Sequence, residues 1–212
     1  MDKLIISYHD SCLYKSDVEI LYLETEWIND RIISFYFDYL QHEIYESKEI
    51  LFLGSEVTQA IKLMENPDEI NAVILDPLDV EEKNFIIFPI NDNSKDQVGG
   101  SHWSLLVYSK PDKTFYHFDS SGSSNYWVCS KLVNIIKSCL KLSNNVKIEQ
   151  VDCLQQNNCY DCGIYVLCHA DSVCKTIMKS KTLKEIQKIN YKTVLSKRSA
   201  LLGIIKHLEN TD

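Results

Sequence analysis

The sequence predicts an α+β fold in which helices flank a central, mostly antiparallel sheet. Three strand-like segments follow one another between residues 85 and 119, and segments with apolar residues at helical spacing lie before and after them. The chain has 212 residues, of which 45% are hydrophobic and 25% are charged, so it is long enough to bury one core. Because no change in composition marks a linker, we expect residues 1–212 to form a single domain.

Helices are predicted in the part of the chain before the strands. Residues 31–41 (RIISFYFDYLQ) carry apolar side chains at helical spacing, and Asn29 or Asp30 can cap the start of this helix. Trp27 therefore lies just before a helix, where its ring is easily presented to a cleft, although the pattern alone favours a ring that covers the core. Shorter pieces follow: a strand or loop at 50–53, a helix capped by Ser55, and a helical piece between Pro67 and Pro77.

Residues 85–119 are predicted to form an antiparallel meander. Its strands are 85–90 (FIIFPI), 102–108 (HWSLLVY) and 114–119 (TFYHFD). A turn that begins at Pro111 joins the last two. The loop 91–101 is polar, ends in a pair of glycines and a serine, and is too long for a tight turn, which is typical of a lid or a binding loop.

Helices dominate the prediction after the meander. A flexible loop (SSGSSN) precedes an amphipathic helix at 126–142, and a strand at 147–151 leads into a cysteine-containing loop. Two further helices are expected from residue 162 to about 179 and at 193–209. The chain shows no internal repeat.

The charge and the cysteine pattern narrow the possible functions. A formal charge of −8 and a pI near 5.3 argue against nucleic acid as the main partner and are compatible with a basic protein or peptide. The start MDKLIISYHD has no signal-peptide pattern, and no apolar run approaches the length of a membrane span. We therefore expect a soluble, intracellular protein without a membrane partner, in which the eight scattered cysteines are reduced.

The segment 155–168 (QQNNCYDCGIYVLC) contains the best candidate nucleophile, Cys162. A polar loop closes there onto an apolar run, so the cysteine falls in the first turn of a helix. Unpaired backbone N–H groups and the positive end of the helix dipole favour a thiolate at that position. Gly163 is expected to leave room beside the thiol for another backbone or a substrate chain. The alternative is a buried structural cysteine.

Three further residues complete a candidate catalytic set. His102 begins one central strand and Asp119 ends the next, so an antiparallel hairpin places them side by side. A carboxylate beside an imidazole fixes its tautomer and leaves the other ring nitrogen free to take a proton from a thiol. Gln156 lies six residues before Cys162, and its side-chain amide can join the Cys162 backbone N–H in an oxyanion hole. Each residue alone has a simpler explanation, but their joint placement at element ends favours a Cys-His-Asp site.

The motifs around these residues resemble those of the ubiquitin-like-protein proteases, the sentrin-specific protease family. The matching motifs are His102-Trp103, Asp119-Ser120, Gln156 followed by Asp161-Cys162-Gly163, and Trp27-Ile28-Asn29-Asp30, which is similar to the family's Trp-Leu-Asn-Asp segment. The resemblance spans about residues 7–175. Within the family, the stretches INDNS, HWSLLVY and YDCG are most similar to the deneddylase type.

The resemblance implies a papain-like cysteine protease that cuts after the C-terminal Gly-Gly of a ubiquitin-like protein. It would act as an endopeptidase on precursors and as an isopeptidase on conjugates. For the deneddylase type, the implied partners are the neddylation modifier and its conjugates, such as cullins. The implied enzyme is a monomer of the cytoplasm and nucleus that needs no cofactor and no metal, and the helix at 193–209 would pack on the protease fold.

The resemblance also implies a set of tail-binding residues. In the family, two tryptophans roof a channel too narrow for anything but glycine. The loop 91–100 is expected to move over the tail when the substrate arrives. From its charge and position alone, and not from the resemblance, Asp30 is a candidate partner for an arginine of the tail. The residues expected to bind the tail are therefore Trp27, Trp103, Asp30, Asn91, Gly99 and Gly100.

Several other interpretations remain open. Cys159 and Cys162 form a Cys-x-x-Cys pair beside a helix start, which is also the pattern of thiol oxidoreductases, although no βαβ pattern precedes it. A structural zinc site formed by these cysteines, Cys168 and His169 has unsuitable spacing. A non-catalytic module that binds ubiquitin-like proteins would not need an intact Cys-His-Asp-Gln set. A protease for another ubiquitin-like protein, of the sentrin/SUMO type, is the alternative nearest in function.

Overall fold

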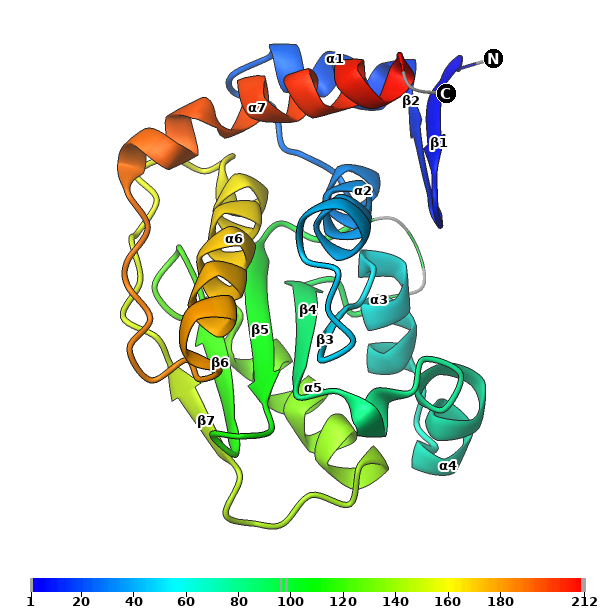
Figure 1. The fold of residues 1–212 in the computed structure, drawn as a ribbon, viewed down its shortest axis with the longest axis vertical. Coiled ribbons are helices and arrows are strands. Elements are labelled where there is room, and N and C mark those ends of the chain that lie inside the picture. Colours follow the sequence, from blue (N-terminus) through cyan, green and yellow to red (C-terminus); the bar gives the residue numbers. More distant parts are fainter. Residues whose placement is uncertain (1, 96, 98, 211–212) are drawn as a thin grey trace.

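The computed structural model describes residues 2–95, 97 and 99–210, and it shows a five-stranded sheet between two groups of helices (Figure 1). In chain order the elements are β1 (Leu4–Tyr8), β2 (Ser11–Tyr14), α1 (Lys15–Tyr22), α2 (Asp30–Tyr39), η1 (Leu40–Ile44), β3 (Ile50–Phe52), α3 (Ser55–Leu63), α4 (Pro67–Ile70), η2 (Asn71–Leu75), η3 (Val80–Glu82), β4 (Phe85–Asn91), β5 (Trp103–Ser109), β6 (Thr114–Phe118), α5 (Tyr126–Cys139), β7 (Lys147–Gln150), α6 (Cys162–Ser180) and α7 (Tyr191–Glu209).

The sheet has the strand order β3-β4-β5-β6-β7. Strands β4, β5 and β6 pair antiparallel, which confirms the predicted meander, whereas β3 joins β4 and β7 joins β6 in parallel. Parallel neighbours need a crossover connection, and helices supply it here: α3 and α4 lie between β3 and β4 in the chain, and α5 lies between β6 and β7. The sheet is therefore mixed at its edges and antiparallel at its centre.

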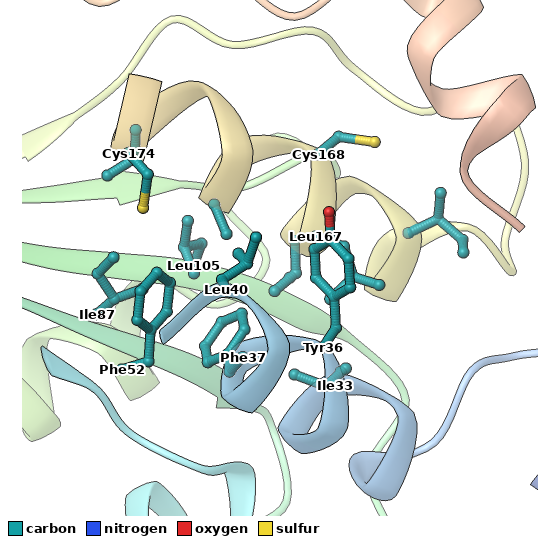
Figure 2. Packing of buried hydrophobic residues seen from close by; sticks show 14 of the residues in the cluster. Ile33, Tyr36, Phe37, Leu40, Phe52, Ile87, Leu105, Leu167, Cys168 and Cys174 are labelled. Atoms are coloured by element: carbon teal, nitrogen blue, oxygen red, sulfur yellow. The ribbon is translucent and has the colours of Figure 1, made fainter. Parts of the chain in front are cut away.

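Both faces of the sheet are buried, which explains why its central strands are almost continuous apolar runs. Ile87 and Leu105 belong to a core cluster that also contains side chains of α2 and α6. Their chain neighbours Phe88 and Leu106 point to the other face and belong to a second cluster with α3, α4 and α5. Figure 2 shows the first cluster, in which side chains of α2 and α6 converge on the strands.

The predicted helices are present, but one predicted cap is wrong. Helix α2 begins at Asp30, and Asn29 caps it by accepting an N–H of the first turn at 3.1 Å. At the start of α3 the cap position is taken by Gly54 instead of Ser55. The Ser55 hydroxyl instead bonds to the Ser34 hydroxyl and to the Asp30 carbonyl, because this side chain is buried against α2.

A further group of elements lies where the two ends of the chain approach each other (Figure 1). The β1–β2 hairpin packs with α1 against α7; it was not predicted, because its strands have only five and four residues. Helix α7 also packs on α6, so the helix predicted at 193–209 is present and begins two residues earlier. Among the described residues, no helix has the length and apolar character needed to cross a membrane.

Candidate active site

Cys162 is the first residue of α6, and only 2% of its surface is exposed. The loop before it is organised by Asn158, whose side-chain oxygen accepts the backbone N–H groups of Tyr160 and Asp161 at 3.1 and 3.0 Å. The Asn158 amide also donates to the Asp161 carboxylate at 2.8 Å. The amide-rich segment therefore folds into a turn that brings the thiol to the positive end of a 19-residue helix.

His102 and Asp119 meet at one end of the β5–β6 hairpin. The register pairs Leu105 with Phe118 at this end of the hairpin. His102 lies shortly before Leu105 in the chain and Asp119 directly follows Phe118, so the two residues extend beyond the same end of the ladder. His102 Nε2 lies 2.6 Å from Asp119 Oδ1, and both side chains are buried. The Cys162 side chain is close enough to the His102 ring to raise the pKa of the imidazole. The structure thus brings together the three residues that the sequence predicts to be neighbours.

The electrostatics of this cluster favour a charged imidazole. Burial lowers the pKa of His102, but its hydrogen bonds to the Asp119 and Cys162 side chains and the charges of both groups outweigh burial and raise the pKa from 6.5 to about 9. Burial likewise opposes ionisation of Asp119. Hydrogen bonds from His102 and from the backbone N–H groups of Asn125 and Ser121 outweigh it and keep the pKa of Asp119 below its usual value. We therefore expect a carboxylate–imidazolium pair at neutral pH.

Gln156 is held beside the nucleophile loop by three hydrogen bonds. Its Oε1 accepts from the Ser120 hydroxyl at 2.7 Å, and its backbone N–H donates to the Ser120 carbonyl at 2.8 Å. Its Nε2 donates to the Asn158 carbonyl at 2.7 Å. A primary amide has a second N–H, which takes no part in these three bonds. Because Ser120 directly follows Asp119, one short segment orients both the carboxylate and the amide.

A cavity of about 530 Å³ adjoins this cluster. Its lining includes all the residues that the sequence assigns to tail binding: Trp27, Trp103, Asp30, Asn91, Gly99 and Gly100. Trp103 follows His102 in the chain, and Ile28, which also lines the cavity, lies against Gly163 next to the candidate nucleophile. Trp27 is 43% exposed, so its ring is available to the cavity and is not a core side chain.

The loop between β4 and β5 forms one wall of the cavity and is tied to α3. Gln59 Nε2 donates to the Lys95 carbonyl at 2.9 Å, and Lys62 Nζ donates to the Asn93 carbonyl at 2.9 Å. Lys62 is buried, which lowers its pKa to about 8 although the charge of Asp92 opposes this shift. The sequence did not reveal these anchors, because they lie 36 and 31 residues from the carbonyls they bind.

Gly100 is required by the conformation of this loop. Its φ is +96°, and a Cβ there would lie 1.9 Å from Asn91 Oδ1. That oxygen accepts the Asn93 N–H at 2.8 Å, so the contact is part of the fold of the loop. The movement of the loop over a tail stays a prediction, and residues 96 and 98 of the loop lie outside the described residues.

The room that the sequence predicts beside Gly163 is occupied by another segment of this chain, at Ile28. A Cβ at this position would lie 2.4 Å from Ile28 Cγ1 and 2.9 Å from Ile28 Cδ1. A glycine is needed because the side chain of Ile28 occupies this space beside the first turn of α6. The contact joins the helix that carries Cys162 to the segment that carries Trp27.

We expect Gly163→Ala to lower the free energy of unfolding by about 1–2 kcal/mol. Because the Cβ would lie only 2.4 Å from Ile28 Cγ1, overpacking should cost about 2–3 kcal/mol, and the higher helix propensity of alanine offsets about 1 kcal/mol of it. Gly203→Ala is the control, since Gly203 lies in α7 with open space around its Cβ position, and it should stabilise the protein slightly. Chemical denaturation measures both, and a Gly163→Ala variant as stable as the wild type would contradict the importance of the Ile28 contact.

Arg198 of α7 connects the two segments that flank the cavity. Its guanidinium donates to the Ile20 carbonyl at 3.2 Å, to the Glu26 carbonyl, and to the Asp161 carboxylate at 3.3 Å. Glu26 and Asp161 directly precede the first cavity tryptophan and the candidate nucleophile. This residue was not predicted from the sequence, because nothing in the local pattern of α7 indicates partners so far away.

Among the described residues, the cysteines form no disulfide and belong to no cluster placed to hold a metal ion. All eight, which lie within the described part of the chain, are free thiols. Cys159 is exposed, whereas Cys162 is buried and raises the pKa of the His102 ring. Over residues 2–95, 97 and 99–210, no group of three or more His, Cys, Asp or Glu side chains is placed to hold a metal ion. The Cys162 thiol is therefore the partner of an imidazole.

A buried thiol at a helix start, paired with an imidazole that a carboxylate orients, defines a cysteine protease of papain-like α+β fold. Comparison with known proteins then identifies the family. Residues 26–200 match the model described as the Ulp1 protease family, C-terminal catalytic domain. This chain belongs to the Ulp1 protease family.

Individual relatives agree with this assignment. The chain is 35% identical over 211 residues to sentrin-specific protease 8 of Homo sapiens, with 98% of this chain and 99% of that protein covered. It is 33% identical over 217 residues to NEDD8-specific protease 1 of Arabidopsis thaliana, with 98% and 94% covered. Among solved structures, the C-terminal Ulp1 protease domain in complex with Smt3, the yeast orthologue of SUMO, is 20% identical with a TM-score of 0.73 and covers 97% of this chain and 87% of that one. The predicted fold and family are confirmed.

Proposed function

We propose that this chain is a deneddylase, a cysteine protease that cleaves after the C-terminal Gly-Gly of the ubiquitin-like modifier NEDD8. The proposal is carried by one observation, the cavity lined by Trp27 and Trp103 beside the Cys162, His102 and Asp119 cluster. The relative from Arabidopsis thaliana is named a NEDD8-specific protease, which supports NEDD8 as the modifier.

Cys162 is the nucleophile in this proposal. The proton of its thiol resides on His102, so the thiolate sulfur attacks the carbonyl carbon of the last glycine, and the oxyanion accepts hydrogen bonds from the Cys162 backbone N–H and the Gln156 side chain. His102, protonated and oriented by Asp119, gives its proton to the leaving amine, and a thioester forms between Cys162 and the modifier. Water then attacks the thioester with His102 as the base, which releases the modifier with a free carboxylate and restores the Cys162–His102 pair.

The cavity is proposed to hold the C-terminal tail of the modifier. Two glycines offer no side chains to bind, so selectivity for them requires walls that exclude a Cβ, and the flat rings of Trp27 and Trp103 are suited to that role. Asp30 is proposed to pair with a basic side chain of the tail. The loop residues that complete the wall are Asn91, Gly99 and Gly100.

The substrates, assembly and location of the enzyme are proposed on similar grounds. We infer that precursors and conjugates, such as those on cullins, are both cleaved, because a thioester can form from a peptide or an isopeptide bond. A single protease domain over residues 1–212 accords with the family match and with the packing of α7 on α6. We propose a monomer of the cytoplasm and nucleus without a cofactor, a metal, or a nucleic-acid or membrane partner, in accord with the net charge of −8.

A protease for SUMO is the second candidate, because the solved Ulp1 domain with a TM-score of 0.73 is in complex with a SUMO orthologue. The test is a panel of NEDD8, SUMO and ubiquitin that each carry a C-terminal electrophile. We expect NEDD8 to form a covalent adduct at Cys162, identified by peptide mass spectrometry. An adduct with SUMO but not with NEDD8 would favour the second candidate, and no adduct at Cys162 with any of the three would contradict the proposed site.

We expect kcat/KM to stay high through neutral pH and to fall as the pH rises through about 9, where His102 loses its proton. The imidazolium is needed to protonate the leaving amine, and its pKa is raised above the usual 6.5. Asp119→Asn removes a negative charge that favours the imidazolium, so the alkaline limb should move to lower pH while the rate falls. A pH–rate profile of both proteins measures the shift.

Asp112→Asn is the matched control for this experiment. Asp112 lies at the other end of the β5–β6 hairpin, where burial is outweighed by hydrogen bonds from the Leu183 N–H and the Thr182 and Ser109 hydroxyls, so that its pKa is also lowered. The substitution makes the same change of charge away from His102, and the alkaline limb should stay near its wild-type position. If the alkaline limb of the Asp119→Asn variant also stays at its wild-type pH, the role given to Asp119 is contradicted.

A further inference from the structure

The turn that follows β6, residues 119–125, holds the Asp119 carboxylate from two sides. Ser121 N–H donates to Asp119 Oδ1 and Asn125 N–H donates to Asp119 Oδ2, both at 2.9 Å. His102 Nε2 lies 2.6 Å from Asp119 Oδ1. The β5–β6 ladder ends at the pair Leu105 and Phe118, so no strand pairing fixes Asp119 relative to His102. The distance between the carboxylate and the imidazole therefore depends on how the turn is held against the start of β5.

The Asn125 side chain spans the gap between the turn and the strands. It is fully buried, and its Nδ2 lies 3.1 Å from Ser104 Oγ, 3.3 Å from the Ile90 carbonyl and 3.4 Å from the His102 carbonyl. One amide thus reaches the end of β4, the start of β5 and the backbone of His102 itself. The segment that carries Asp119 is joined to the segment that carries His102 through this side chain.

The contacts of Asn125 differ from those that its place in the chain favours. Asn125 is the N-cap of α5, where an asparagine side chain normally accepts an N–H of the first helical turn. Within the described residues, it makes no such bond, and its Oδ1 has no hydrogen-bond partner. Because the Asn125 oxygen has no partner, the orientation of this buried amide is set by its Nδ2 contacts with the three acceptors around His102.

A chain of hydrogen bonds extends from Asn125 into the sheet. His117 Nε2 lies 2.9 Å from Ser104 Oγ, and His117 Nδ1 lies 2.8 Å from Gln150 Oε1. Burial lowers the pKa of His117, so its ring is neutral. With Gln150 as the acceptor, Nδ1 carries the proton, Nε2 accepts from the Ser104 hydroxyl, and the Ser104 oxygen accepts from the Asn125 amide. Each group has one consistent role, which fixes the direction of the Asn125 amide.

We propose that Asn125 is a positioning residue for the reaction: it holds the Asp119 turn against the start of β5, so that the carboxylate stays within hydrogen-bond distance of the His102 ring. Asn125 acts through Asp119 and His102 and not on the substrate. The inference rests on the proposed catalytic roles of these two residues.

The test is Asn125→Ala, with Asn71→Ala as the matched control. Asn71 also donates its amide to a backbone carbonyl, that of Cys139 at 2.9 Å, and its buried Oδ1 likewise lacks a partner in the described part of the chain. It belongs to η2, however, and contacts the end of α5 that is opposite Asn125. We expect Asn125→Ala to lower kcat by about 10- to 100-fold with little change in KM and to move the alkaline limb of the pH–rate profile to lower pH. Asn71→Ala should change only the melting temperature.

Two further variants keep the test decisive. Ser104→Ala removes one acceptor of the Asn125 amide, and Asn125→Ser shortens the side chain but keeps one donor. Both variants should also move the alkaline limb to lower pH, and they take the place of Asn125→Ala in the test if that protein does not fold. In the double variant with Asp119→Asn, the Asn125 substitution should have no further effect on kcat, because the two residues act together.

The outcomes separate this inference from the proposed function. A wild-type kcat and pH profile in a folded Asn125→Ala protein would overturn the positioning role, even if the melting temperature fell. If Asp119→Asn moves the limb and no Asn125 variant does, only the role of Asn125 fails. If Asp119→Asn also leaves the limb in place, the assignment of Asp119 itself fails.

Discussion

Cys162→Ala is expected to lower the rate of cleavage by several orders of magnitude while leaving binding of the modifier nearly intact. The sulfur forms the bond to the scissile carbon, and loss of one member of a catalytic set costs about 10³-fold or more in rate. Binding is proposed to depend on the cavity lined by Trp27 and Trp103, and the lining of this cavity does not include Cys162. Turnover of a NEDD8 precursor and its Kd by calorimetry measure the two effects separately.

Cys159→Ala is the control for this experiment. Cys159 lies three residues before Cys162 and is exposed, so its substitution should leave turnover near the wild-type rate. Turnover at the wild-type rate by Cys162→Ala would remove Cys162 as the nucleophile. A loss of binding together with turnover would show that the start of α6 also shapes the binding surface.

Trp103→Ala is expected to lower kcat/KM for Gly-Gly tails by about 30- to 1,000-fold. Truncating a tryptophan that anchors a bound chain costs about 2–4 kcal/mol, and each 1.4 kcal/mol corresponds to about a factor of ten. Trp127→Ala is the matched control, because Trp127 is 81% exposed on α5 and lies outside the cavity lining. A Trp127→Ala variant as impaired as Trp103→Ala would contradict a specific role for the cavity ring.

The same cavity predicts selectivity against any side chain at the last position of the tail. A NEDD8 precursor that ends in Gly-Ala should be cleaved far more slowly by the wild type than one that ends in Gly-Gly, because rings packed around a glycine leave no room for a Cβ. Parallel assays of the two precursors make the comparison directly. Equal rates would contradict a narrow channel at this cavity.

The features predicted correctly from the sequence depend on interactions between residues close in the chain. Apolar runs and a turn at Pro111 define the central meander, and the register of a short hairpin then brings His102 to Asp119. Cys162 at the start of α6 follows from the change from a polar loop to an apolar helical pattern. For these residues, local signals are sufficient.

The features that were missed depend on partners far apart in the chain. The partner of Gly163 was not identified because Ile28 belongs to a different segment, and Ser55 was taken for a cap because its contacts in α2 cannot be read from its own segment. The anchors Lys62 and Arg198 bind backbone carbonyls of distant loops, and a carbonyl has no sequence signal. The parallel edge strands β3 and β7 likewise depend on which distant strand accepts them.

Helix α7 joins segments that a ribosome makes far apart in time. Arg198 bonds to carbonyls 178 and 172 residues earlier in the chain, so these contacts can form only after most of the polypeptide exists. The β5–β6 hairpin closes locally and can form early, with His102 and Asp119 already paired. A nascent chain is therefore expected to form its sheet before Arg198 links the segments that precede Trp27 and Cys162. We expect proteolytic activity to appear only when α7 docks.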